Sequence, residues 1–467
     1  MSLDIMTVEV WLRAFSDPDL PLVRLIRERL AGEVREAEEA LFGIIVLRTI
    51  QPGFLQKIRA LTDGAQVIVL LAPDTRLNLD TKWSLFAAGA SDILDWPGEA
   101  RLAECIVPRV ERWAEIEATI SDSRVRNSVV GASPVWRNLL RQVAEIAMFS
   151  GAALLLTGET GTGKEQIARL VHMLDRRPRK SDLVVVDCTT LSRELMGSEL
   201  FGHERGAFTG AIAAHDGAVA MANRGTLFLD EIGELDLPLQ AQLLRVIQER
   251  SFKRLGSNIW QEADFRLICA TNRNLESDIG HGRFRADLYF RIADRCLHLP
   301  PLRERRKDIL PLATHFWRTG GASSQNPDFD PALREFLATR DYPGNVRDLR
   351  RVVIALRSRH AGGGTVSIGA LPETERPLPP MMEEANDQDA AQVSSISWND
   401  SAGFINAIEA AIAGGIGLRE IGRAASSAAI RVALEQENGN LQRAARRLGV
   451  TDRALQMRRA NGDAMTT

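Results

Sequence analysis

The sequence has few cysteines and no long apolar run. Its four cysteines, Cys105, Cys188, Cys269 and Cys296, are scattered and never spaced as CxxC, so the sequence predicts neither a disulfide framework nor a zinc site. No run of about 18 uncharged apolar residues occurs, and acidic residues stand too early in the chain for a secretory signal. We therefore expect a cytoplasmic protein that has no membrane partner.

The chain also lacks an excess of charge of either sign, with 58 Lys and Arg against 61 Asp and Glu and a net charge of −3. This balance excludes a uniformly basic nucleic-acid coat, but it does not exclude one basic module among acidic ones. The 467 residues are 45% hydrophobic, which is typical of globular proteins. At roughly 100–200 residues per domain, this length predicts two to four domains.

Shifts in composition divide the chain into four parts. Residues 1–120 alternate apolar strands with amphipathic segments, which is typical of a small parallel α/β domain. Residues 129–360 alternate in the same way but hold more glycine and loop motifs. Residues 361–400 concentrate Gly, Pro and acidic residues, as a flexible linker does, and residues 401–467 return to helical spacing. The predicted class is α/β with an all-α C-terminal segment.

A glycine-rich turn, GETGTGKE, follows the apolar strand ALLLT and precedes a predicted helix. Its glycines let backbone N–H groups close around phosphates, and the helix N-terminus adds the positive end of its dipole. Lys164 then supplies a point charge to the β- and γ-phosphates. Glu165 replaces the Ser or Thr that usually follows this lysine, so Mg²⁺ must take other ligands. A plain glycine-rich turn is the alternative interpretation.

Two later strands end in polar side chains. GTLFLDEIGEL delivers Asp230 and Glu231, of which Asp230 suits a Mg²⁺ ligand and Glu231 suits a base that polarises water. FRLICATN ends in Thr271 and Asn272, which could sense a γ-phosphate. Together these strand ends predict ATP hydrolysis, with ATP and Mg²⁺ as cofactors. Solvated strand ends are the alternative.

The segment ELFGHERGAFTGA contains the hexapeptide GAFTGA. With GETGTGKE, GTLFLDEI, FRADLYFRI, LPPLRERRKDI and DYPGNVRDLR in the same order and spacing, it resembles bacterial enhancer-binding proteins, the AAA+ ATPases that activate sigma-54 RNA polymerase. The resemblance covers residues 129–357 closely and implies an AAA+ P-loop ATPase domain with a helical lid. It also implies three partners: sigma-54 RNA polymerase, upstream promoter DNA, and further copies of the chain, as a dimer assembling to a hexamer-like ring.

The resemblance implies roles for single residues. Arg285 and Arg291 match arginines that reach the ATP of a neighbouring subunit, although surface ion pairs are the alternative. Arg347 matches the sensor arginine of the lid, and Asp187 stands where the family often has an asparagine that switches the catalytic glutamate. The implied catalytic residues are Asp230, Glu231, Arg285 and Arg291. The implied nucleotide-binding residues are Gly158, Glu159, Thr160, Gly161, Thr162, Gly163, Lys164, Glu165, Asp230, Asn272 and Arg347.

The GAFTGA segment has neither a helical nor a strand period, and its glycines flank an aromatic residue. We therefore expect a mobile loop that presents Phe208 to a partner, although a Phe among Gly and Ala can also be tucked into a core. The resemblance implies that Phe208 and Thr209 contact sigma-54 when ATP is bound. The implied contact residues are Gly206, Ala207, Phe208, Thr209, Gly210 and Ala211.

Residues 1–120 resemble a response-regulator receiver in strand order and in the segment GASDILDWP, but three functional positions differ. Arg48 stands where the phosphoacceptor aspartate ends the third strand, Leu71 at the switch Thr or Ser, and Trp96 at the lysine. An arginine cannot accept a phosphoryl group as a carboxylate does. We interpret this part as a degenerate receiver that is controlled by a protein partner, a small ligand or expression level. A domain kept for folding or dimer contacts is the alternative.

The C-terminal segment IRVALEQENGNLQRAARRLGVTDRALQMRRA predicts short helices separated by glycine turns, and it resembles a Fis-type helix-turn-helix. Its stretch 431–460 holds seven arginines against three acids, a local charge of +4, which suits contacts to phosphates. The candidate DNA-binding residues are Thr451, Arg453, Gln456, Arg458 and Arg459. A helix pair that serves only dimerisation is the alternative.

These features together predict a sigma-54-dependent transcriptional activator that binds upstream DNA and uses ATP hydrolysis to remodel the closed promoter complex. Two other functions stay open at this point. One is an AAA+ remodeller of another protein target, and the other is a DNA-binding repressor with a vestigial ATPase.

Overall fold

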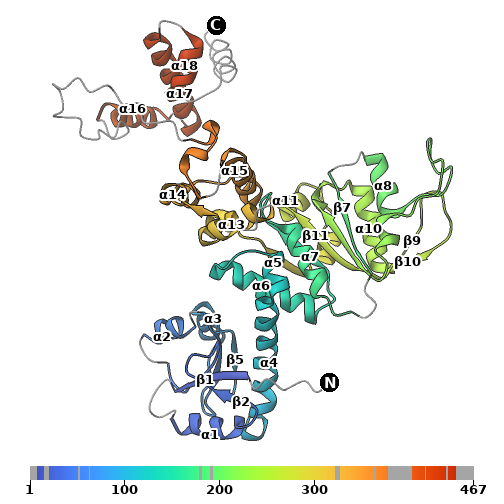
Figure 1. Cartoon of the computed structure of the whole chain (residues 1–467), viewed down its shortest axis with the longest axis vertical. Coiled ribbons are helices and arrows are strands. Elements are labelled where there is room, and N and C mark those ends of the chain that lie inside the picture. The colour runs from blue at the N-terminus through green and yellow to red at the C-terminus, as the bar shows by residue number, and fades with distance from the viewer. Residues whose placement is uncertain are drawn as a thin grey trace. The chain divides into compact units, whose positions relative to one another are not determined.

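A computed structural model describes residues 8–14, 20–50, 53–62, 64–177, 181–189, 193–320, 327–361, 364–376, 402–415, 417–437 and 440–448 (Figure 1). The chain divides into two compact units, Met1–Arg376 and Pro377–Thr467. In the described ranges, no helix is both long enough and apolar enough to cross a bilayer.

The first part of the Met1–Arg376 unit is a five-stranded parallel sheet in the order β2-β1-β3-β4-β5. Its strands are β1 (Val8–Ala14), β2 (Val34–Glu36), β3 (Phe42–Leu47), β4 (Gln66–Leu71) and β5 (Asp92–Leu94). Helices α1 (Leu20–Leu30) and α4 (Leu102–Ser121) pack on one face, and α2 (Phe54–Leu61) and α3 (Leu79–Ala87) pack on the other. Because helices cover both faces, β3 and β4 are almost wholly buried. The strand order is that of flavodoxin-like doubly wound sheets.

The three positions that depart from a receiver lie at the carboxyl ends of these strands. Arg48 directly follows β3 and pairs with Asp74 at 3.6 Å, while its carbonyl oxygen accepts a hydrogen bond from the Thr75 hydroxyl at 2.8 Å. Leu71 is the buried last residue of β4, and Trp96 packs against the core beneath α1 and α4. The end of β3 therefore carries a cation that is paired with an acid.

Two consecutive helices, α4 and α5 (Ser123–Ser128), connect the first sheet to the next part of the chain. They meet at Asp122, whose carboxylate accepts the Arg124 N–H at 2.7 Å and so begins a new helix. Near the end of α4, the buried Glu117 accepts hydrogen bonds from Arg137, at 2.7 Å, and from Arg141. Both arginines belong to α6 (Pro134–Phe149), so this polar cluster attaches the connecting helix to the next part of the chain.

The second sheet holds five parallel strands in the order β12-β6-β11-β8-β7. The strands are β6 (Leu154–Thr157), β7 (Leu183–Asp187), β8 (Thr226–Asp230), β11 (Arg266–Thr271) and β12 (Arg295–His298). Helices α6 and α7 (Lys164–Leu174) cover one face. The other face is covered by α8 (Arg193–Phe201), α9 (Ala218–Met221), α10 (Leu237–Glu249), α11 (Leu275–Gly280) and α12 (Ala286–Ile292). A short antiparallel pair, β9 (Ser251–Phe252) and β10 (Gln261–Glu262), follows α10. The predicted α/β class with parallel sheets is confirmed.

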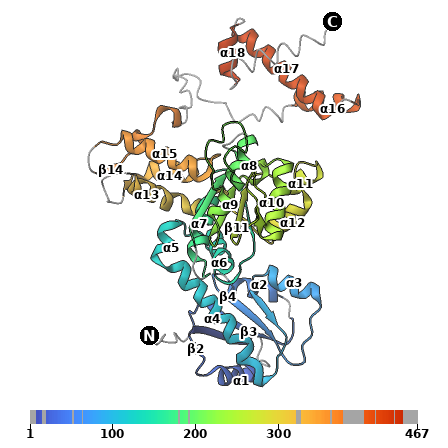
Figure 2. The same ribbon diagram turned by 90° about the vertical axis from the view of Figure 1, so that its right-hand side faces the viewer.

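A small helical lid follows this sheet, and its three main helices cluster together at one side of the sheet in both views (Figure 1, Figure 2). They are α13 (Ile309–Thr319), α14 (Pro331–Thr339) and α15 (Asn345–Arg359). The chain enters the lid through two short 3-10 turns, η4 (Leu302–Glu304) and η5 (Arg306–Asp308). The lid has its own core, around Leu302, Trp317, Leu333 and Leu356.

The lid continues beyond residue 360, where the sequence predicts the start of a linker. The strand β14 (Thr365–Val366) pairs with β13 (Asp328–Phe329), and Leu371 is buried in the lid core. Glu375 accepts hydrogen bonds from Arg340 at 2.8 Å and from Arg351 at 2.7 Å. The glycine- and acid-rich composition therefore places the start of the linker too early, because Glu375 forms hydrogen bonds with two arginines of the lid. The compact unit reaches Arg376.

The Pro377–Thr467 unit is helical in the ranges that the structure describes. Its helices are α16 (Ala402–Ala413), α17 (Leu418–Gln436) and α18 (Leu441–Arg447). Ala433, Ala444 and Ala445 are buried between α17 and α18, and the Asn440 carboxamide accepts the Arg443 N–H at 3.1 Å at the start of α18. The predicted DNA-binding residues Thr451, Arg453, Gln456, Arg458 and Arg459 lie outside the described residues.

Candidate active site

The glycine-rich loop connects β6 to α7 in a conformation that requires glycine. Gly158, Gly161 and Gly163 have φ angles of +145°, +79° and +106°, a region that other residues rarely adopt. At Gly161 a Cβ atom would lie 2.2 Å from the carbonyl oxygen of Gly344, and the Gly161 carbonyl accepts the Val346 N–H at 2.9 Å. The lid backbone therefore lies directly against the loop.

Lys164, the first residue of α7, is held between this loop and an acid. It is only 6% exposed, its ammonium donates to the Gly158 carbonyl at 3.0 Å, and Nζ lies 3.5 Å from Oε1 of Glu231. A desolvated cation at the end of a phosphate loop interacts strongly with anions. Its position suits the β- and γ-phosphates of a nucleotide.

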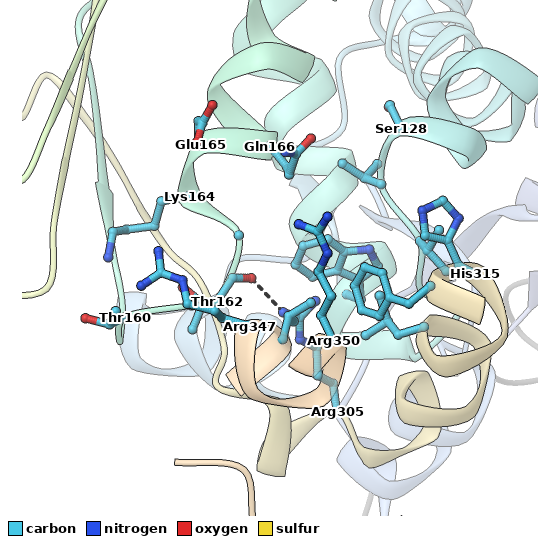
Figure 3. A pocket seen from close by; sticks show the side chains of 18 of the residues that line it. Ser128, Thr160, Thr162, Lys164, Glu165, Gln166, Arg305, His315, Arg347 and Arg350 are labelled. Carbon is cyan, nitrogen blue, oxygen red and sulfur yellow. Dashed lines mark hydrogen bonds between the residues drawn. The ribbon is translucent and has the colours of Figure 1, made fainter. Parts of the chain in front are cut away.

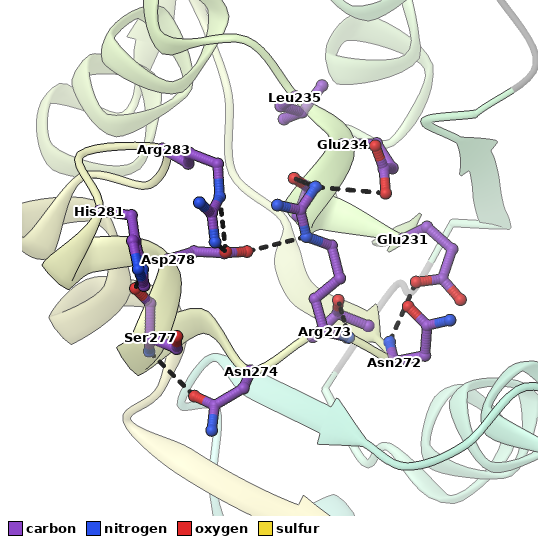
Figure 4. Close-up of polar contacts among 12 residues, drawn as sticks. Glu231, Glu234, Leu235, Asn272, Arg273, Asn274, Ser277, Asp278, His281 and Arg283 are labelled. Carbon is purple, nitrogen blue, oxygen red and sulfur yellow. Dashed lines mark hydrogen bonds and ion pairs between the residues drawn. The ribbon is translucent and has the colours of Figure 1, made fainter. Parts of the chain in front are cut away.

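The acidic pair lies where β8 ends. Oδ1 of Asp230 accepts the Glu231 N–H at 3.1 Å. Burial raises the pKa of the Asp230 carboxyl, and the neighbouring charge of Glu231 raises this pKa further. Glu231 has a φ of +50°, a left-handed conformation that costs a non-glycine residue about 1–3 kcal/mol. This turn brings Oε2 of Glu231 within 3.0 Å of the Asn272 N–H (Figure 4).

Asn272 also reaches the phosphate loop. Its side-chain amide donates to the Thr160 hydroxyl at 3.1 Å, so one residue at the end of β11 contacts both the loop and the Glu231 carboxylate. Asp187 ends β7 in register with Asp230, and its carboxylate accepts hydrogen bonds from the N–H and hydroxyl of Thr189 at 2.9 and 2.7 Å. The carboxyl ends of four parallel strands thus gather polar side chains at one edge of the sheet.

A cavity of about 450 Å³ runs from the loop to the lid (Figure 3). Lys164 and Thr160 lie at one end of it and His315 at the other. The predicted site residues that line it are Thr160, Gly161, Thr162, Gly163, Lys164, Glu165, Asp230, Glu231 and Arg347. Gly158 and Glu159 of the loop, and Asn272, which bonds Thr160, are not among the described residues that line the cavity. Arg303 and then Asn345 donate to Glu159, which lowers the pKa of this carboxyl to about 2.

Sequence reasoning missed the residues at the lid end of the cavity. Its walls there include Val129, Trp136, Leu312, His315 and Phe316, which come from three separate segments and carry no common motif. Arg305 and Arg350 also line the cavity. A signal for Arg350 was present, since it follows Arg347 by one turn of α15 and helical spacing places both on one face.

Comparison with known proteins agrees with this geometry. The Sigma-54 interaction domain matches residues 129–298, and the AAA+ ATPase lid domain matches residues 303–388. Regulatory protein AtoC of Escherichia coli is 34% identical over 410 residues, which are 86% of this chain and 83% of AtoC. The chain belongs to the family of sigma-54-dependent transcriptional regulators.

Other relatives of this sigma-54-dependent regulator match a smaller part of it. The Nif-specific regulatory protein of Azospirillum lipoferum is 49% identical over 229 residues. That match spans 49% of this chain and 36% of the length of the Nif regulator. Among solved structures, NtrX from Brucella abortus in complex with ADP aligns with 97% of this chain and 99% of its own, at 23% identity and a TM-score of 0.49.

Two predicted catalytic residues of the regulator lie away from the cavity. Arg285 immediately precedes α12, is exposed, and pairs with Asp287 at 2.6 Å. Arg291 is an exposed residue of the same helix, next to Phe290, which is 73% exposed. Neither arginine is among the described residues that line the cavity. Within one copy of the chain, the structure does not bring them to the nucleotide site.

The GAFTGA segment forms a compact turn. Gly206 and Gly210 have φ angles of +81° and +103°, and the Gly206 N–H donates to the Ala211 carbonyl at 2.9 Å, which closes the turn. Phe208 is 38% exposed, and its ring lies edge-on to His203 with centroids 4.9 Å apart. The aromatic residue is therefore half-covered by a neighbouring ring and lies outside the hydrophobic core.

Proposed function

We propose that this chain activates transcription by hydrolysing ATP to remodel the closed promoter complex of sigma-54 RNA polymerase. The observation that carries the proposal is the cavity in which the glycine loop, Lys164, Asp230 and Glu231 meet beneath the lid arginine Arg347. A phosphate loop, a buried cation and an acidic pair are the parts that phosphoryl transfer to water requires.

Asp230 fits the role of Mg²⁺ ligand. Its carboxylate is desolvated beside a second acid, which raises its pKa, and a bound cation would relieve this cost. Mg²⁺ commonly takes one or two carboxylates together with substrate phosphates, so Glu165 after the lysine is compatible with such a site. When bound, the ion would neutralise charge that develops on the phosphates.

Glu231 is the proposed base for the attacking water. Its carboxylate lies beside Lys164 and accepts the Asn272 N–H. Phosphates in the cavity would attract the Lys164 ammonium and free one oxygen of Glu231 for water. Asn272, which also bonds Thr160 in the loop, would then report the state of the γ-phosphate. Asp187 is the proposed switch residue at the neighbouring strand end.

Arg285 and Arg291 are proposed to act on the ATP of a neighbouring copy. Both are exposed, Arg285 directly before α12 and Arg291 on it, and neither lines its own cavity. This supports a ring in which hydrolysis depends on assembly. Arg285 would have to leave its surface pair with Asp287, which costs little. A dimer that assembles to a hexamer-like ring is the proposed state.

The remaining parts have proposed roles in contact and control. The six residues of GAFTGA, with Phe208 and Thr209 foremost, would touch sigma-54, and Thr451, Arg453, Gln456, Arg458 and Arg459 would contact upstream DNA. The strand order of the N-terminal sheet supports a receiver-like domain. Arg48 paired with Asp74 supports control without phosphotransfer, and labelling of residues 1–120 by a cognate kinase would contradict it.

Two variants test the proposal in an assay with sigma-54 RNA polymerase and supercoiled promoter DNA. Lys164→Ala should lose ATP binding and all activity, because it removes the buried ammonium that lies against the glycine loop. Thr209→Ala should hydrolyse ATP at the wild-type rate and fail to form open complexes. Open complexes formed by the Thr209 variant would refute the loop assignment. A wild-type chain without ATPase activity would instead favour a repressor, and ATPase activity without sigma-54 capture would favour another remodelling target.

A further inference from the structure

One buried cation lies beside the candidate site and has no part in the mechanism above. Arg305 stands between η4 and η5, where the chain passes from the sheet into the lid. It is 2% exposed, whereas the side chains of Arg303 and Arg306 on either side are 57% and 47% exposed. Of the three neighbouring arginines Arg303, Arg305 and Arg306, Arg305 is therefore the buried one.

Two contacts hold the guanidinium of Arg305. One Nη donates to the Thr162 carbonyl oxygen at 2.8 Å, and the guanidinium carbon lies 4.0 Å from the centre of the Trp136 ring. The Nε atom is buried and has no hydrogen-bond partner. Burial lowers the pKa of Arg305 to about 10, and the nearby charge of Asp308 opposes this shift. The group therefore stays charged at neutral pH.

A buried charge is costly unless an opposite charge or several hydrogen bonds compensate it. Arg305 has one hydrogen bond and an aromatic face, and no carboxylate forms an ion pair with it in the part of the chain that the structure describes. It also lines the cavity. An anion in the cavity would supply the compensation that the protein itself provides only in part.

The bond to Thr162 has a geometric consequence for the phosphate loop. In a trans peptide the C=O and the N–H of one peptide group point in opposite directions. Holding the Thr162 carbonyl toward Arg305 therefore directs the Gly163 N–H away from it. Lys164 lies on the opposite side of the loop from Arg305 in Figure 3. Arg305 thus fixes the Thr162–Gly163 peptide, one peptide group before the one that joins Gly163 to the phosphate-binding lysine.

The same junction ties the loop to the lid and to α6. Asp308, fully buried, accepts hydrogen bonds at 2.7 Å from the N–H groups of Ala132 and Ser133 and from the Ser133 hydroxyl. Asp308 lies three positions after Arg305, and α13 begins directly after Asp308. Movement of the lid would therefore move the group that orients Thr162.

We propose that Arg305 is a positioning residue for nucleotide binding, which orients the phosphate-loop amides through Thr162 and favours an anionic ligand by its charge. This inference rests on the proposed function, because it takes the ligand to be a nucleoside polyphosphate. A role in folding alone would leave the nucleotide affinity of the folded protein unchanged.

The test compares ADP binding by calorimetry to the full chain and to three variants, Arg305→Met, Arg305→Lys and the matched control Arg306→Met. A hydrogen bond from a charged donor contributes enough that Arg305→Met should weaken ADP binding about 10- to 100-fold. Arg305→Lys should lie between Arg305→Met and wild type, since an ammonium keeps the charge but loses the planar stack on Trp136. Arg306→Met should stay within about twofold, as a surface change does.

Kinetics give a second readout. Because Arg305 touches the loop and not the reacting phosphate, the KM for ATP should rise in both Arg305 variants while kcat changes little. Wild-type ADP affinity in a folded Arg305→Met protein would overturn the proposal. If that variant does not fold, wild-type affinity in Arg305→Lys overturns it equally. A wild-type chain that binds ADP but hydrolyses no ATP would refute the proposed function and leave the binding comparison valid.

Discussion

The ion pair between Lys164 and Glu231 gives the sharpest prediction about the site. The Nζ atom of Lys164 and the Oε1 atom of Glu231 lie 3.5 Å apart, and the two side chains are 6% and 19% exposed. We expect that each charge stabilises the other until phosphates replace the carboxylate. The perturbation is a double-mutant cycle of Lys164→Met, Glu231→Gln and the double variant, all nearly isosteric changes.

The magnitude follows from the distance and the burial. At an effective dielectric constant of about 20, two unit charges 3.5 Å apart attract by about 5 kcal/mol. Desolvation of both groups cancels much of this attraction, so we expect a coupling free energy of about 1–2 kcal/mol, within the range found for contacting residues. Lys164→Met alone should cost more than Glu231→Gln alone, because it leaves Glu231 unpaired beside Asp230.

The assay is thermal unfolding of the full chain without nucleotide, followed at the transition that ADP shifts in the wild type. For a domain of this size, 1 kcal/mol moves the midpoint by about 2–4 °C. A second readout is ADP affinity, which should rise several-fold in Glu231→Gln because Lys164 no longer has to leave an acid. Additive midpoints together with unchanged ADP affinity would refute the reasoning.

Three further predictions concern the same site. Burial and Glu231 raise the pKa of Asp230 above that of an ordinary carboxyl group. The stability that the protonated Asp230 contributes is therefore present below the ordinary carboxyl pKa, and it is lost as the pH rises through the raised pKa of the folded protein. Asp230→Asn should therefore have a higher unfolding midpoint than the wild type at pH 7 and a similar midpoint at low pH, and it should no longer hydrolyse ATP. Equal midpoints at pH 7 would contradict this prediction. The pKa of Glu159 is lowered to about 2, chiefly by its hydrogen bond from Arg303. Above the ordinary carboxyl pKa, the wild type should therefore be more stable than Arg303→Gln. In an acid titration of unfolding, this difference should disappear as the pH falls toward 2. Gly161→Ala would place a Cβ against a lid carbonyl at 2.2 Å and should cost about 1–3 kcal/mol and weaken ADP binding, which calorimetry would measure.

Much of the candidate site was readable from the chain because its parts are local. A glycine turn between a strand and a helix, and an acidic pair at a strand end, are patterns of fewer than about fifteen residues. The structure brings Thr160, Lys164, Asp230 and Glu231 to one cavity, as parallel strands with a common carboxyl edge require. The succession of strands and helices along the N-terminal part is likewise a local feature, because it follows from the alternation of apolar and amphipathic segments.

Other features depended on contacts between distant segments. The stretch after residue 360 has the glycine- and acid-rich composition of a linker. One of its acids, Glu375, nevertheless accepts hydrogen bonds from Arg340 and Arg351 and so belongs to the lid. The left-handed Glu231 and its pairing with Lys164 have no signature in the sequence. Neither does the half-covered Phe208, whose ring lies against that of His203 in the folded chain.

The sequence by itself determined which side chains the candidate site offers: a glycine loop that suits phosphates, a strand end that carries two acids, and an N-terminal part with Arg48 where a receiver has its aspartate. It could do so because short-range backbone preferences and residue types fix these features. Only the tertiary structure decided what surrounds that chemistry. Arg305 is buried and its two arginine neighbours are exposed because Trp136 and Thr162, both more than 140 residues away in the chain, meet it there.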